Sequence, residues 1–184
     1  MDFYKLWPRI SLIAAIIFAA VIVFFIPINS ALFWVWVNVP LQLLHQFEEH
    51  GKGRFKKFAN KELFKSKTLS DKQLFRVDAP ISWILFPILA ITSFIDMASG
   101  LLLPYVAAVD SITHIALSAF KREYTPGLIV SIMQFPVAII SIIMLELKAN
   151  LSPMSHVIAI IALVILFGLI FFKIWQLNKK TLHK

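Results

Sequence analysis

The chain has 184 residues, of which 59% are hydrophobic and only 15% charged, with a net charge of +8 and no cysteine. Soluble domains average about 25% charged residues, and a soluble fold of this length could not bury so much apolar surface, so the composition excludes a soluble domain. The lack of cysteine excludes disulfide bonds and thiolate metal sites.

Six apolar segments follow one another along the chain, each near the roughly 20 residues that a helix needs to cross a bilayer. They cover residues 10–26, 31–49, 80–96, 101–120, 127–147 and 153–175. A basic loop at about 50–79 separates the second segment from the third. We therefore expect an all-α polytopic transmembrane bundle of about six helices, forming a single membrane domain over residues 1–184. The second and third segments are the shortest, so one of them could be re-entrant.

Positive charge is distributed unevenly along the chain. Nine of the eighteen Lys and Arg residues lie between Lys52 and Arg76, and most of the others lie at the chain ends or segment boundaries. Six spans place nearly all of them on one side, which the positive-inside rule assigns to the cytoplasm. We expect both termini there, with the basic residues beside anionic membrane lipids. Because orientation accounts for the charge, nucleic acid is not expected as a partner.

The basic loop also carries apolar residues, among them Phe55, Phe58 and Leu74. Ser70 followed by Gln73 resembles a capping box, which predicts the start of a short helix. Two interpretations stay open, an amphipathic helix on the lipid surface and a solvated loop with aromatic anchors.

Polar residues, which are costly in lipid, form stripes on two of the segments. In the second segment Asn38, Gln42, His45 and Glu49 follow one another at spacings of four, three and four, and Glu48 lies beside them. These spacings place them on one helical face. His50 falls off this stripe and is expected to face the membrane boundary.

The fourth segment carries Asp110, His114 and Ser118 at successive spacings of four. His45 and His114 lie about fourteen and thirteen residues from the same end of their segments, so they should lie at nearly the same depth in the cytoplasmic half. We expect these two histidines to converge with Asp110, Glu48 and Glu49 in one pocket.

Imidazoles and carboxylates without sulfur suit a divalent metal such as zinc, iron or manganese. Helical bundles use the related Glu-x-x-His spacing for carboxylate-bridged metals. The predicted metal ligands are His45, Glu48, Glu49 and His114. Asp110 would orient His114 or act as a base, and the amides of Asn38 and Gln42 would contact substrate. Two alternatives stay open, a proton or substrate pathway and a set of structural contacts between helices.

A second motif, Lys121 to Gly127, forms a turn between the fourth and fifth segments. Tyr124 could direct its hydroxyl into the pocket, and Arg122 could bind a phosphate or carboxylate head group. The alternative is a capped turn with basic anchors, because proline and glycine stop one helix before the next.

The chain resembles the HXXEE family of small bacterial membrane proteins. The resemblance rests on His45-Gln46-Phe47-Glu48-Glu49, followed by His114 and by Arg122-Glu123-Tyr124-Thr125-Pro126-Gly127, and it covers about residues 30–145. It implies a polytopic protein of the bacterial inner (plasma) membrane and functional roles for His45, Glu48 and Glu49. It supplies no reaction, because the family is named for its motif.

Three hypotheses about function follow. The first is a metal-dependent membrane enzyme that acts on a lipid-like or other amphipathic substrate, with Asp110 and Tyr124 as catalytic residues. The second is a small transporter or proton-coupled permease, and the third is a structural or regulatory membrane protein. The sequence does not distinguish oligomeric states.

Overall fold

The computed structural model is built of helices and describes residues 2–63 and 69–182, so part of the predicted basic loop and the terminal Lys184 lie outside the described residues. The α-helices of the described chain are α1 (Phe3–Phe25), α2 (Ala31–Trp36), α3 (Asn38–His50), α4 (Arg54–Phe58), α5 (Asp71–Pro80), α6 (Phe86–Thr92), α7 (Leu102–Lys121), α8 (Leu128–Ala149) and α9 (Pro153–Leu182). Short 3-10 or π-helical turns are η1 (Gly51–Gly53), η2 (Ala59–Leu63), η3 (Ile81–Leu85) and η4 (Met97–Leu101).

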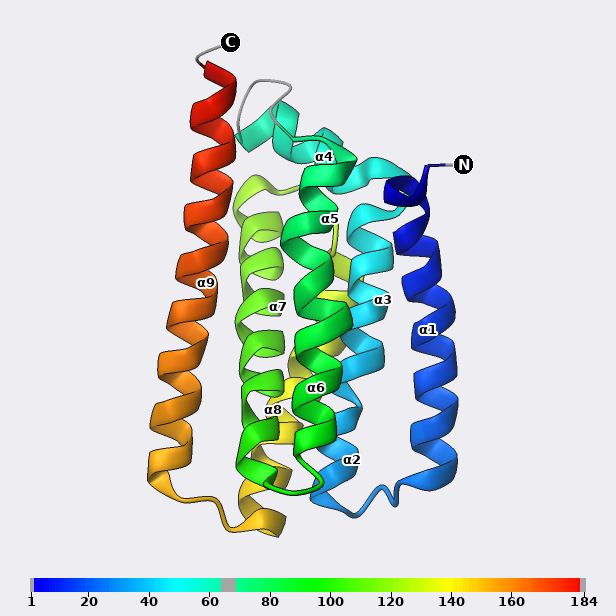
Figure 1. The fold of residues 1–184 in the computed structure, drawn as a ribbon, viewed down its shortest axis with the longest axis vertical. Helices are drawn as coiled ribbons and strands as arrows, with labels where there is room; N and C mark the ends of the chain where they lie inside the picture. Colours follow the sequence, from blue (N-terminus) through cyan, green and yellow to red (C-terminus); the bar gives the residue numbers. More distant parts are fainter. Residues whose placement is uncertain (1, 64–68, 183–184) are drawn as a thin grey trace.

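The helices form an upright bundle in which α1 begins and α9 ends at the same end (Figure 1). Five helical stretches in the described chain are long and apolar enough to cross a membrane, namely 3–25, 71–92, 97–121, 128–149 and 153–177. The second predicted segment is divided at Val37 into α2 and α3, which lie end to end along the bundle. The prediction of an all-α polytopic transmembrane bundle is confirmed, while the cytoplasmic location of the termini stays a prediction.

Helices α1 and α9 flank the bundle on opposite sides (Figure 1). Both expose most of their apolar side chains, as expected for helices that face lipid. His156 joins α9 to α7 and α8, because its Nδ1 lies 2.8 Å from the Tyr105 hydroxyl and its Nε2 contacts Glu146. His156 therefore fixes α9 near its first turn, far from the end where the chain terminates.

The third span begins earlier than the sequence suggested. The helical stretch starts at Asp71 and continues through η3 to Thr92, whereas we expected a span from residue 80 and a basic loop before it. Ser70 sets this start, because its hydroxyl accepts from the Gln73 N–H at 3.3 Å and its own N–H donates to Gln73 Oε1 at 2.8 Å. The predicted capping box is confirmed, and the helix it begins runs on into the membrane.

Replacing Ser70 with alanine should lower the free energy of unfolding by about 1 kcal/mol, because the N–H groups of the first turn lose their acceptor. Ser70→Asp keeps an acceptor and should stay close to wild type. Both can be compared by denaturant unfolding of the detergent-solubilised protein. Equal midpoints for Ser70→Ala and wild type would contradict a stabilising role for this cap.

Candidate metal centre

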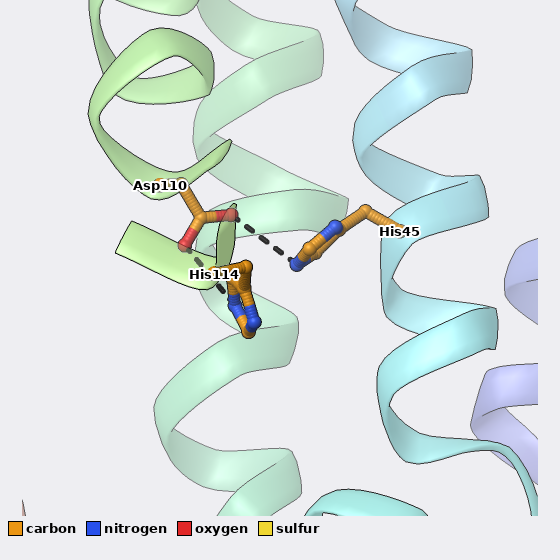
Figure 2. Close-up of side chains that lie close together, drawn as sticks. All are labelled: His45, Asp110 and His114. Atoms are coloured by element: carbon orange, nitrogen blue, oxygen red, sulfur yellow. Dashed lines mark ion pairs between the residues drawn. The ribbon is translucent and has the colours of Figure 1, made fainter. Parts of the chain in front are cut away.

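Two histidines and one aspartate from neighbouring helices converge inside the bundle (Figure 2). His45 comes from α3, and Asp110 and His114 come from successive turns of α7. The Nε2 atom of His45 lies 3.4 Å from Asp110 Oδ2, and the Nε2 atom of His114 lies 3.8 Å from Asp110 Oδ1. The two imidazole rings lie 4.8 Å apart between centroids. The shared depth of the histidines that the sequence predicted is confirmed.

These three side chains each offer a ligand atom, and the ligand atoms all lie within 4.8 Å of one another. Ligands at about 2.1 Å from a tetrahedral ion are about 3.4 Å apart, so small side-chain movements toward one another would bring these atoms to the spacing of such an ion. Both ring nitrogens of His45, which is fully buried, and Nδ1 of His114 lack hydrogen-bond partners among the described residues. Buried polar atoms without partners are costly, and a bound cation would give one nitrogen of each ring a partner.

The two glutamates of the motif have different surroundings. Glu49 faces the histidines, with Oε2 at 3.6 Å from His45 Nε2 and Oε1 at 3.8 Å from His114 Nε2. Glu48 instead accepts hydrogen bonds from the N–H groups of Ile129 and Val130, at 3.0 and 2.6 Å. Helix α8 begins beside the end of α3, and the unpaired N–H groups of its first turn favour an anionic acceptor. The geometry therefore places Glu49, but not Glu48, beside the histidines.

The turn between α7 and α8 packs directly on the histidines. Tyr124 donates its hydroxyl hydrogen to Glu48 Oε1 at 2.9 Å. This hydroxyl therefore connects the turn to a glutamate of the motif, whereas we expected it to be directed into the pocket. Partial burial raises the pKa of the Tyr124 hydroxyl, which keeps this donor protonated at neutral pH. Gly127 has a φ of +96°, and a Cβ there would lie 2.7 Å from His45 Cε1 and 2.9 Å from His114 Nδ1. Glycine is thus required both by the backbone and by the space.

A family match covers this whole arrangement. The family described as "Protein of unknown function with HXXEE motif" matches residues 36–141, which include both histidines, both glutamates and the turn. The chain belongs to the HXXEE family. No curated protein and no solved structure matches the chain.

In this HXXEE protein the predicted substrate-binding residues have structural partners. Asn38 Nδ2 donates to Ser141 Oγ at 3.1 Å, and Gln42 Oε1 accepts from Gln134 Nε2 at 2.9 Å, so both amides connect α3 to α8. Arg122 is exposed in the left-handed conformation that ends α7, with a φ of +55°. The sequence spacing correctly placed Asn38 and Gln42 on the inward face of their helix. It could not show that α8 packs against this face at Asn38 and takes up the hydrogen bond of its amide.

His50 and Asp78 are residues that the sequence reasoning missed. His50 was expected at the membrane boundary, yet it is buried, and its Nε2 lies 3.3 Å from both Glu49 Oε2 and Asp78 Oδ2. The expectation failed because Trp7 of α1 covers the ring, with centroids 4.9 Å apart. Asp78 was assigned to the basic loop, although it lies on a helix. Its position directly before a run of apolar residues that begins at Ala79 was the available signal.

A cavity of about 420 Å³ opens beside the histidines. The polar residues that line it include Glu49, Asp110, His114 and Gln42. Elsewhere the wall is largely apolar, with residues of α7 and α9 such as Val106, Leu117, Phe167, Ile170, Phe171 and Ile174. The cavity thus combines a mainly apolar lining with carboxylate and imidazole groups that can act as ligands.

Proposed function

We propose that this HXXEE protein is a membrane-embedded enzyme that uses a divalent metal ion, zinc, iron or manganese, on a lipid-like substrate. The observation that carries the proposal is the group His45, Asp110 and His114, whose ligand atoms lie within 4.8 Å of one another inside the bundle. Glu49 supplies a further carboxylate at 3.6 and 3.8 Å from the two imidazoles. Nitrogen and oxygen donors without sulfur fit these metals.

The cavity supports the choice of substrate. Its apolar wall suits an acyl or isoprenoid-like chain, since binding sites for such groups are lined mainly by hydrophobic side chains. Glu49, Asp110 and His114 meet the same cavity, so a polar head group would lie against them. We place the protein in the plasma membrane, where lipids would be both its surroundings and the source of its substrate.

Each residue of the centre has its own role in the proposed reaction. His45 and His114 would hold the ion, which when bound supplies Lewis-acid polarisation of an oxygen in the substrate or in water. Asp110 is partly exposed to the cavity, so one oxygen of its carboxylate can complete the ligand set beside His114 while the other accepts a proton from a group bound there. Tyr124, which we expected to be catalytic, has a supporting role through Glu48 in this proposal.

Metal analysis of the purified protein tests the proposal. We expect stoichiometric metal in wild type and loss of most of it in His45→Ala and His114→Ala, while His156→Ala, at the other end of the bundle, keeps it. With free metal at about 100 times the dissociation constant, a chelator should lower the free energy of unfolding by about 2.7 kcal/mol. A wild-type protein that holds no metal, and that chelator does not destabilise, would exclude a metal enzyme.

A further inference from the structure

His50 extends the ligand-bearing region beyond the first three residues. It is buried, with 6% of its surface exposed, and both ring nitrogens lack hydrogen-bond partners among the described residues. Nevertheless its Nε2 lies 3.3 Å from a carboxylate oxygen of Glu49 and 3.3 Å from one of Asp78. These separations match those between His45, Asp110 and Glu49, where 3.4 and 3.6 Å separate the nitrogen from the two oxygens.

Glu49 belongs to both groups. Its Oε2 lies 3.6 Å from His45 Nε2 and 3.3 Å from His50 Nε2, and its Oε1 lies 3.8 Å from His114 Nε2. One carboxylate therefore lies between imidazoles on either side. Carboxylates in this position bridge pairs of metal ions in helical bundles, and the ions of such pairs are typically about 3.5–4 Å apart.

The charge of the region also calls for cations. In the part of the chain that the structure describes, the ion-pair partners of Glu49, Asp78 and Asp110 are all histidines, with no Lys or Arg within 4.0 Å. When the imidazoles beside them are neutral, as metal ligation requires, three ionised carboxylates carry an uncompensated charge of about −3 in a low-dielectric setting, which is costly. One divalent ion brings that charge to about −1 and two bring it to about +1, so either number of ions offsets most of it.

We infer that the centre holds two divalent cations, the first on His45, Asp110 and His114 and the second on His50 and Asp78, with Glu49 bridging them. This inference rests on the proposed function, because it adds a second ion to the same centre. It gives Asp78 a role in binding metal and places both ions along one wall of the cavity, since Glu49, Asp78, Asp110 and His114 all line it. A paired centre can polarise two oxygens of one substrate at once.

The test is the metal stoichiometry of the full chain in detergent after loading with Mn²⁺ and desalting. Wild type should hold about two Mn²⁺ per chain and give the electron paramagnetic resonance signal of an exchange-coupled pair. Asp78→Asn and His50→Gln should each hold about half as much and give the signal of isolated Mn²⁺. Asp96→Asn removes a carboxylate at the opposite end of the bundle and should match wild type, and size-exclusion profiles would show that each variant is folded.

The outcomes separate the two proposals. About one Mn²⁺ per wild-type chain with an uncoupled signal, unchanged in Asp78→Asn, would overturn the paired centre and leave the single-metal enzyme standing. In that case a proton on His50 between its two carboxylates would take the place of the second ion. No Mn²⁺, Zn²⁺ or Fe²⁺ bound by wild type would overturn both. Because the wild-type ratio alone decides between one and two ions, the test does not depend on every variant folding.

Discussion

Replacing Gly127 with alanine is expected to abolish metal binding and to lower the free energy of unfolding by about 2 kcal/mol or more. The residue has a φ of +96°, which an L side chain rarely adopts, and its Cβ would lie 2.7 Å from His45 and 2.9 Å from His114. Neither ring can retreat easily, since His45 is fully buried and both are packed by neighbouring helices. The methyl group would therefore displace the ligands themselves. Metal content and denaturant unfolding measure the two effects.

Gly168→Ala is the matched control, because a Cβ there meets nothing within 4 Å. It lies within α9, where alanine is a better helix former than glycine by up to about 1 kcal/mol, so this variant should be as stable as wild type or slightly more so. Full metal content and wild-type stability in Gly127→Ala would show that the turn does not position the histidines.

Replacing Glu48 with glutamine is expected to lower the free energy of unfolding by about 2–3 kcal/mol. Its carboxylate accepts from two N–H groups of the first turn of α8 and from the Tyr124 hydroxyl, and an amide NH₂ would face one of these donors. Because the residue acts on α8 rather than on the ion, the folded fraction should keep its metal. Glu49→Gln should show the opposite pattern, losing metal. Denaturant unfolding together with metal analysis distinguishes the two variants.

Glu123→Gln serves as the control for charge alone, since Glu123 is exposed beside the same turn. It should unfold at the same denaturant concentration as wild type. If Glu48→Gln lost its metal but kept wild-type stability, Glu48 would be a ligand, as the sequence alone suggested.

Sequence reasoning predicted the parts of the centre that depend on helix geometry. His45 and His114 lie at nearly equal distances from the same ends of their segments, which predicted that they share one depth in the bundle. The spacing of four residues predicted that Asp110 lies one helical turn before His114 on the same face. It could not separate Glu48 from Glu49, because adjacent residues differ by about 100° around a helix and both remained near the stripe. The first turn of α8, far away in sequence, decides which of the two faces the histidines.

The missed residues have a similar cause. Asp78 lies in an amphipathic stretch whose basic residues resembled a loop, and only the continuous helix from Asp71 brings it to His50. His50 is buried by Trp7 of α1, a contact that no spacing along α3 could indicate. The second predicted span is also a case in which sequence reasoning reached only part of the result. Its helix is divided at Val37 into α2 and α3, and α3 carries many polar residues, so this pair differs from the five apolar helices that are long enough to cross a membrane.

The way in which α9 packs on the bundle has a mechanical consequence. His156 joins α9 to α7 and α8 near its first turn, and Leu177 packs beside Leu69 and Leu74 toward its other end. Between them, Phe167, Ile170, Phe171 and Ile174 form part of the cavity wall through apolar contact. Apolar contacts are non-directional, so a small shift of this wall costs less than the same shift of a wall held by hydrogen bonds would cost.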